Sequence, residues 1–258
     1  MERLTIVKVG GKVVEKPELL QRLLADFSRI SGNKLLVHGG GKSATAMAER
    51  LGIETKMING RRITDEAMLE VVIMVYAGLV NKKVVAGLQA LNCNAIGLTG
   101  ADMDLIRAKK RPVVDIDYGF AGDIIDVSTR ELESIIDQGV VPVIAPLTHD
   151  GNGLMLNTNA DTIASELAIA LSRKYRVQLI FCFEKKGVLA DPEDDHSVIR
   201  ELDYQKFQEY KETGVITEGM IPKLDNGFSA MRNGVESVVI SNPEALGGDL
   251  KHGTRLMF

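Results

Sequence analysis

The sequence predicts an α/β protein in which a central, mainly parallel, open sheet lies between two layers of helices. Short apolar runs alternate with amphipathic segments from the N-terminus onward, an order typical of βαβ units. Two of these runs, at residues 4–9 and 35–37, end directly in glycines, and a helical pattern follows each. Parallel strands end in this way where a backbone-lined turn meets the N-terminus of a helix.

Each expected element has a local reason. The apolar runs predict strands at residues 4–9, 35–37, 94–98, 140–145, 177–183 and 236–240. Helical periodicity and propensity predict helices at 17–30, 43–51, 65–91 with an interruption near Gly78, 128–138, 160–174, 204–212 and 222–231. Ser128, followed three residues later by Glu131, matches a capping box and should begin its helix. Gly and Pro break residues 106–127 into short β-rich pieces, which predicts hairpins.

The chain has one candidate domain boundary. One helix ends and a fresh strand–loop–helix unit begins near residues 173–176, without a Ser/Gly-rich linker. We therefore expect two lobes, residues 1–174 and 175–258, on one continuous sheet.

Composition excludes several classes of protein. The 258 residues are 45% hydrophobic and 26% charged, as in ordinary soluble globular proteins. A net charge of −4 gives no electrostatic reason to expect nucleic acid or an anionic membrane as partner. No apolar run is expected to span a bilayer, and no leader segment is recognised. Cys93 and Cys182 are interpreted as reduced core thiols of a cytoplasmic protein.

The first glycine turn follows a strand that contains a lysine. Lys8 lies two residues before Gly10 and Gly11 in an otherwise apolar run. Burying a lysine is unfavourable unless the charge has a partner, so Lys8 should face a polar site. At the end of a parallel strand, such a lysine can reach a transferring phosphoryl group.

The second glycine turn, Gly39-Gly40-Gly41-Lys42-Ser43, is not a Walker P-loop, because that motif requires glycine where this chain has Leu36. Three consecutive glycines directly after a strand are more than a plain turn requires. They predict a turn whose amides bind an anion.

Three further groups of polar residues are candidates for the site. Asn157, Asn159 and Asp161 lie where a strong helix opens; capping explains one of them, and Asp161 can pair with lysines. Lys223 lies in the first turn of a helix, where the dipole disfavours a cation, which indicates a bound anion or a solvated surface lysine. Arg62, beside Arg61, suits a carboxylate or faces solvent. The four histidines lack metal-ligand spacing, and His38 should pack beneath the glycine turn.

Together these motifs resemble the amino acid kinase family, and the acylglutamate kinases in particular. The shared pattern is Lys8-x-Gly10-Gly11, His38-Gly-Gly-Gly41, Asn59-Gly-x-Arg62-x-Thr64, Asn157-x-Asn159-Ala-Asp161 and Gly219-Met-x-x-Lys223, in that order over nearly the whole chain. The resemblance implies a three-layer αβα sandwich of the carbamate kinase type. It also implies ATP-dependent phosphorylation of the γ-carboxylate of an N-acylglutamate, the second step of arginine biosynthesis.

The resemblance also implies residue roles. Backbone amides of Gly40 and Gly41 would hold the substrate, and Arg62, Asn157 and Asn159 would bind the acylated amino acid. The phosphoryl group and ATP phosphates would meet Lys8, Gly10, Gly11 and Lys223, while Asp161 holds both lysines. The nucleotide would lie over the second lobe, along Glu184, Gly187, Val188, Leu189, Val215, Ile216 and Thr217.

Cofactor and assembly follow from the same resemblance. Mg²⁺ would be carried mainly by the ATP phosphates, and no protein metal site is expected. The chain lacks the N-terminal extension of arginine-inhibited hexameric members, which favours a homodimer without arginine feedback. The helical segment 65–91 is a candidate dimer surface or internal core. Glu184-Lys185-Lys186 stands where family members usually have Asp, a small residue and Gly, so the nucleotide side departs from the pattern.

Three alternatives stay open on the sequence. The chain could be an aspartate, γ-glutamyl, carbamate or uridylate kinase of the same family, or a non-catalytic amino-acid or nucleotide sensor. The acyl group could be acetyl or succinyl, and the additional carboxylate of succinyl would need a cation such as Arg61 or one within residues 109–111.

Overall fold

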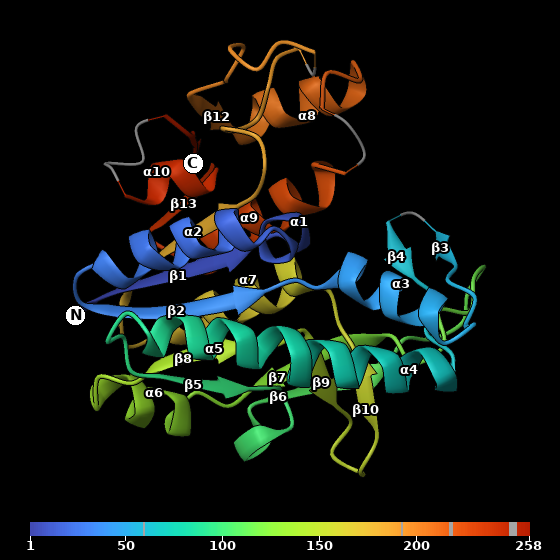
Figure 1. Ribbon diagram of the computed structural model, residues 1–258. Coiled ribbons are helices and arrows are strands. Elements are labelled where there is room, and N and C mark those ends of the chain that lie inside the picture. Colours follow the sequence, from blue (N-terminus) through green and yellow to red (C-terminus); the bar gives the residue numbers. More distant parts are fainter. Residues whose placement is uncertain (59, 192, 217–218, 248–251) are drawn as a thin grey trace.

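A computed structural model describes residues 1–58, 60–191, 193–216, 219–247 and 252–258, and its centre is an eight-stranded, mainly parallel sheet (Figure 1). Of its neighbouring strand pairs only β13 and β14 run antiparallel. The strands in spatial order are β12 (Glu201–Asp203), β14 (Thr254–Met257), β13 (Ser237–Ser241), β11 (Arg176–Cys182), β1 (Arg3–Val9), β2 (Asn33–His38), β8 (Val141–Ile144) and β5 (Ala95–Leu98).

Helices cover both faces of this sheet, which confirms the three-layer sandwich. One hydrophobic core lies between the sheet and the helices α6 (Arg130–Asp137), α7 (Ala160–Leu171), α8 (Tyr204–Glu212) and α9 (Ile221–Arg232). The other core lies beneath α1 (Gly11–Glu15), α2 (Pro17–Arg29), α3 (Gly41–Arg50), α4 (Glu66–Val72), the π-helical segment η1 (Ile73–Val80), α5 (Asn81–Gln89) and α10 (Pro243–Leu246).

Smaller β elements flank the main sheet on the side of the first lobe. The strands β6 (Ile106–Lys110) and β7 (Gly122–Val127) are antiparallel, as predicted for residues 106–127. They join β9 (Leu147–His149) and β10 (Met155–Asn157) in a four-stranded sheet. The hairpin β3 (Met57–Ile58) and β4 (Arg61–Arg62) is separate, and a 3₁₀ turn, η2 (Asp102–Asp104), precedes β6.

Two sequence predictions are wrong: the capping box at Ser128, and the expectation that no apolar segment is long enough to cross a bilayer. The helix α6 begins after Thr129, not Ser128, and neither the predicted capping box nor any other side-chain cap forms at its start. The segment Glu66–Gln89 is one helix of 24 residues, long and apolar enough to cross a membrane by length and composition. Its inner side chains, among them Met68, Val72 and Val84, are buried in the second core. We therefore interpret it as a core helix whose apolar character comes from packing.

The strands β12 and β14, at one side of the main sheet, were not predicted from the sequence. β12 and β14 are three and four residues long, and β14 pairs antiparallel with β13. Short strands carry a weak periodic signal, because alternation needs four or more residues to stand out. All the other predicted strands and helices form, with ends within a few residues of the prediction.

Candidate active site

Two glycine turns meet at the C-terminal ends of the central strands β1, β2 and β11, which lie side by side. The amide of Gly10 donates to the carbonyl of Cys182, and that of Gly39 donates to the carbonyl of Val9, both at 2.9 Å. A Cβ on Gly39 would lie 3.0 Å from the amide nitrogen of Gly11. The turns can pack this closely only because both consist of glycine.

Each turn opens a helix whose first amides lack an acceptor within the helix. Gly11 begins α1 and Gly41 begins α3, and neither helix has a side-chain cap at its start. Glu15 accepts from the amide of Ser43 at 2.9 Å, so one carboxylate already lies at the start of α3. The predicted anion-binding character of the second turn is consistent with this geometry.

Asp161 joins two lysines that are far apart in the sequence. Its Oδ1 lies 2.7 Å from Nζ of Lys8 on β1, and its Oδ2 lies 3.0 Å from Nζ of Lys223 on α9. Lys8 and Asp161 are 6% and 4% exposed. Two ammonium groups therefore share one buried carboxylate, which leaves an excess of positive charge beside Asp161.

The electrostatics of Asp161 depend on these lysines. Burial raises the pKa of its carboxyl group, but the charges and hydrogen bonds of Lys8 and Lys223 more than offset burial and bring the pKa below its ordinary value. The carboxylate therefore stays ionised and holds the lysines, and it is not a general acid or base.

The start of α7 sets the position of Asp161. The side-chain oxygen of Asn159 caps this helix by accepting from the amides of Asp161 (2.7 Å) and Thr162 (3.2 Å). Asn157, two residues earlier on β10, donates from Nδ2 to Oγ1 of Thr64 at 2.9 Å. Of the three polar residues predicted from the sequence, Asn159 caps the helix, Asp161 pairs with the lysines, and Asn157 lines the first cavity described below.

Asp161 also lies between two cavities. The first, of about 200 Å³, is lined by residues that include Lys8, Gly40, Gly41, Arg62, Asn157, Asn159 and Asp161. The second, of about 750 Å³, is lined by Arg61, Asn159, Asp161, Pro222 and Lys223, among others. The structure therefore brings together the predicted amino-acid site and both predicted lysines.

Arg62 is, with Lys8, a buried cation of the first cavity. Its Nη2 donates to the carbonyl of Gly41 (2.7 Å) and to Oγ1 of Thr45 (2.8 Å), which fixes the guanidinium against α3. Arg111 lines the same cavity and forms an ion pair with Asp123. Arg61 lines both cavities from the β3–β4 hairpin.

A third cavity, of about 110 Å³, occupies the second lobe and has mainly apolar walls. Five predicted nucleotide residues, Gly187, Val188, Leu189, Val215 and Ile216, line it together with Lys185 and Met220. The predicted Thr217, like Asn59 of the hairpin, lies outside the described residues.

Thr254 on β14 fixes the wall of this third cavity. Its hydroxyl accepts from the amide of Val188 (2.8 Å) and donates to the carbonyl of Ile199 (2.6 Å). A Cβ on Gly187 would lie 2.6 Å from that hydroxyl, so glycine is required there. The role of Thr254 could not be predicted from the sequence, because the strand β14 that carries it was not predicted.

The unusual segment after β11 forms ion pairs. Glu184 pairs with Lys12 of α1 at 2.7 Å, across the boundary between the lobes, and both side chains are partly exposed. Lys185 pairs with Asp195 at 2.6 Å. Glu184 does not line the third cavity, and its predicted contact with ATP stays a prediction.

His38 packs beneath the second glycine turn, as predicted. It is fully buried; Asn81 donates to its Nε2 (3.1 Å), and its Nδ1 lies 2.8 Å from the carbonyl of Gly39. The carbonyl of Gly39 can only accept, so Nδ1 carries the ring proton and donates it. Nε2 is then the acceptor for the amide of Asn81, which also donates to the carbonyl of Val143. Burial lowers the pKa of His38 to about 4, so the ring is neutral.

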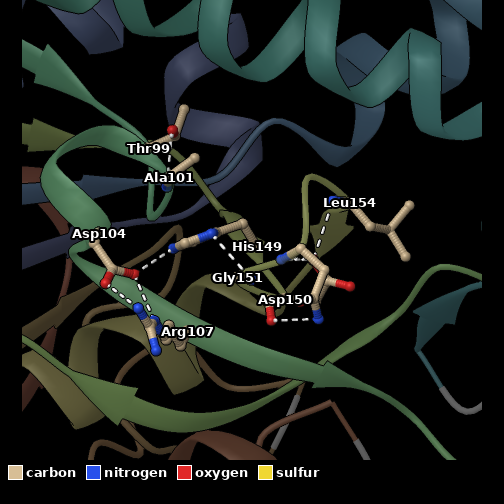
Figure 2. A network of polar contacts seen from close by, with 9 residues as sticks. Thr99, Ala101, Asp104, Arg107, His149, Asp150, Gly151 and Leu154 are labelled. Atoms are coloured by element: carbon tan, nitrogen blue, oxygen red, sulfur yellow. Dashed lines mark hydrogen bonds and ion pairs between the residues drawn. The ribbon is translucent and has the colours of Figure 1, made fainter.

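A separate polar network braces the hairpin that carries Asn157 (Figure 2). Nε2 of His149 on β9 lies 2.9 Å from Oδ1 of Asp104, which also accepts from Nε of Arg107 at 2.7 Å. In the β9–β10 turn, Asp150 accepts from the amide of Leu154 at 3.0 Å. The network lies outside the three cavities and supports β10 from one side.

Metal binding by the protein alone finds no support in the described ranges. Within them, no group of three or more His, Cys, Asp or Glu side chains is arranged to hold a metal ion. Asp161, which lines the first two cavities, is already paired with two lysines.

The model of the amino acid kinase family matches residues 3–242. The chain belongs to the amino acid kinase family. A protein of Parabacteroides distasonis named acetylglutamate kinase is 61% identical over 93% of this chain and 94% of its own length. One of Phocaeicola vulgatus with the same name is 62% identical over 95% of each chain. The solved carbamate kinase from Giardia lamblia has the same fold, with a TM-score of 0.74, 12% identity and 99% and 98% coverage.

Proposed function

We propose that this chain transfers the γ-phosphoryl group of ATP to the γ-carboxylate of an N-acyl-L-glutamate, the second step of arginine biosynthesis. The observation that carries the proposal is Asp161, which holds Lys8 of the first lobe and Lys223 of the second where two cavities meet. The relatives named acetylglutamate kinase support the same activity.

The chemistry needs little from the protein beyond position and charge. A carboxylate is already a nucleophile at neutral pH, so no general base is required. The barrier comes from bringing two anions together and from the negative charge on the equatorial oxygens of the phosphoryl group. Lys8, Lys223 and the glycine amides supply positive charge from different directions, with Asp161 fixing both lysines.

The substrate roles extend this arrangement. The acylated amino acid lies in the first cavity. Gly40 and Gly41 hold its γ-carboxylate through their amides, and Arg62, Asn157 and Asn159 bind its α-carboxylate and acylated amino group. Gly10 and Gly11 face the transferred group. Since Asn159 uses its oxygen to cap α7, only its amide nitrogen is available to the substrate.

The nucleotide lies over residues 175–258, which we treat as the ATP lobe, while residues 1–174 form the amino-acid lobe. The apolar cavity beside Val188 and Ile216 suits the adenine ring. Mg²⁺ enters with the ATP phosphates, whose charge it neutralises. The cations around the site fit a metal carried by the nucleotide better than one held by protein carboxylates.

The acyl group is acetyl if the names of the relatives transfer to this chain. One observation favours succinyl as the second candidate: Arg61 and Arg111 line the first cavity in addition to Lys8 and Arg62. A substrate with a third carboxylate would use this additional charge.

A coupled assay of ADP release tests the proposal. We expect activity with N-acetylglutamate or N-succinylglutamate, and the ratio of their kcat/KM values identifies the acyl group. Activity confined to free glutamate, aspartate, carbamate or UMP would refute the proposed substrate class. Binding of both ligands without any turnover would instead favour a sensor.

Assembly and location complete the proposal. The exposed Met74 and Leu79 on the helix Glu66–Gln89 support a homodimer formed through this helix. The free thiols of Cys93 and Cys182 are consistent with a cytoplasmic protein. Size-exclusion chromatography with light scattering is expected to give twice the mass of the chain.

A further inference from the structure

Tyr76 is a tyrosine of the first cavity that the sequence analysis did not single out. It belongs to the π-helical segment Ile73–Val80 within the long helix and is 5% exposed. Its side chain nevertheless lines the cavity that contains Arg62 and Asn157. Single π-helical turns occur frequently at functional sites, because they change the direction of side chains on an otherwise regular helix.

The ring of Tyr76 shapes the second glycine turn. A Cβ on Gly40 would lie 2.9 Å from Cδ1 and 3.1 Å from Cε1 of the ring. Gly40 is therefore required by the close approach of the tyrosine, since its own φ of 175° is open to any residue. The ring and the turn form one wall of the cavity.

The hydroxyl of Tyr76 has a donor beside it but no acceptor. Burial raises the pKa of the phenol, while the charge and hydrogen bond of the Arg62 guanidinium act in the opposite direction; the net shift is upward. The phenol is therefore protonated at neutral pH. Arginine can only donate, so Arg62 cannot accept the phenol proton. No acceptor for its proton occurs among the residues for which positions are described.

We propose that the hydroxyl of Tyr76 donates a hydrogen bond to the substrate carboxylate bound by Arg62, and so selects amino acids that carry an α-carboxylate. This inference rests on the proposed function and adds a residue to its substrate site. An anion beside Arg62 supplies the missing acceptor and lies on the side of the cavity where Tyr76 and Arg62 meet. Lys8 and Asp161 line the same cavity, and the γ-carboxylate must react beside them.

The variant Tyr76→Phe tests the proposal, because it keeps the ring against Gly40 and removes only the hydroxyl. Hydrogen bonds to charged groups are strong enough that we expect affinity for N-acetylglutamate to fall by roughly tenfold or more. We measure the dissociation constant by calorimetry, together with KM and kcat. KM for ATP and kcat should change by less than about twofold, because the hydroxyl does not contact the reacting atoms.

Tyr204→Phe is the matched control. Tyr204 packs against Phe228 in the second lobe and lies outside the three cavities. We expect unchanged affinity in this variant. A thermal unfolding midpoint near that of the wild type in both variants separates an effect on binding from one on folding.

A ligand without the α-carboxylate, N-acetyl-4-aminobutyrate, completes the experiment. We expect Tyr76→Phe to leave its dissociation constant or inhibition constant unchanged while weakening N-acetylglutamate. Equal losses for the two ligands, or no loss for N-acetylglutamate, would overturn the proposal. Turnover by the wild-type chain is recorded in parallel, so a failure of the proposed kinase activity is recognised separately from a failure at Tyr76.

Discussion

Two regions of the molecule differ in how their cavities are built. The first region is the cavity lined by Lys8, Arg62 and Asp161, all three of them buried. The second region is the cavity beside Val188 and Ile216, which is mainly apolar and whose wall Thr254 fixes through two hydrogen bonds. Under the proposed function, the first region would recognise its ligand by charge and the second by shape. Changes in charge should therefore affect the regions unequally.

Asp161→Asn should have the largest effect, because it leaves two lysines facing each other without a counter-charge. Removing one partner from a buried ion pair costs about 3–5 kcal/mol. We expect kcat to fall by at least about 10³-fold and the thermal midpoint to decrease. Asp137→Asn is the control, since Asp137 forms a partly exposed ion pair with Lys174 outside the three cavities. Retention of kcat in Asp161→Asn would show that the lysines do not need this carboxylate.

Acid should lower the stability of the folded protein through His38, which packs beneath the glycine turn of the first region. Its pKa falls from 6.5 to about 4 in the folded protein. Below pH 6.5 the unfolded chain binds a proton that the folded chain does not, so the free energy of unfolding decreases as the pH falls towards 4. The shift corresponds to about 3 kcal/mol. Denaturant titrations at pH 7 and 4.5 measure this loss, and His38→Gln should reduce it, whereas the exposed His196→Gln should not.

Thr254→Val should affect the second region alone. The variant keeps the volume of the side chain and removes both hydrogen bonds that fix Val188 and Ile199. Since a hydrogen bond contributes about 1 kcal/mol, we expect KM for ATP to rise about tenfold, with KM for the acylglutamate unchanged. Thr254→Ser should restore the wild-type value. A parallel rise in both KM values would contradict the division of labour between the cavities.

The ion pair between Lys12 and Glu184 should give the smallest effect. Both side chains are partly exposed, and pairs of this kind contribute about 0.2–1 kcal/mol. We expect Glu184→Gln to change kcat/KM for ATP by less than about fivefold, with the difference diminishing at high salt. A hundredfold loss would mean that Glu184 takes part in nucleotide binding directly.

The sequence was most informative where function and local structure use the same residues. Lys8 in an apolar strand, the two glycine turns and Asp161 in the first turn of α7 predicted that charged groups would meet at the end of the sheet, and the ion pairs lie there. Their signal is local, because each residue type is unusual for the element that carries it.

Residues whose importance comes from tertiary contacts could not be predicted. Tyr76 looks like any apolar position of a long helix until Gly40 and Arg62 are placed against it. Thr254 acts through backbone groups more than 50 residues away along the chain. The misplaced cap at Ser128 has the opposite cause: a local motif matched, but the chain begins α6 one residue later without any cap.

The kinetics of Lys8→Arg test the central claim most directly. Arginine keeps the charge beside Asp161 but differs in shape from the ammonium group that the proposed phosphoryl transfer uses. We predict that kcat falls by roughly 10²–10³-fold while KM for the acylglutamate and for ATP change only modestly. A kcat near that of the wild type would contradict the assignment of phosphoryl transfer to the junction between the two lobes.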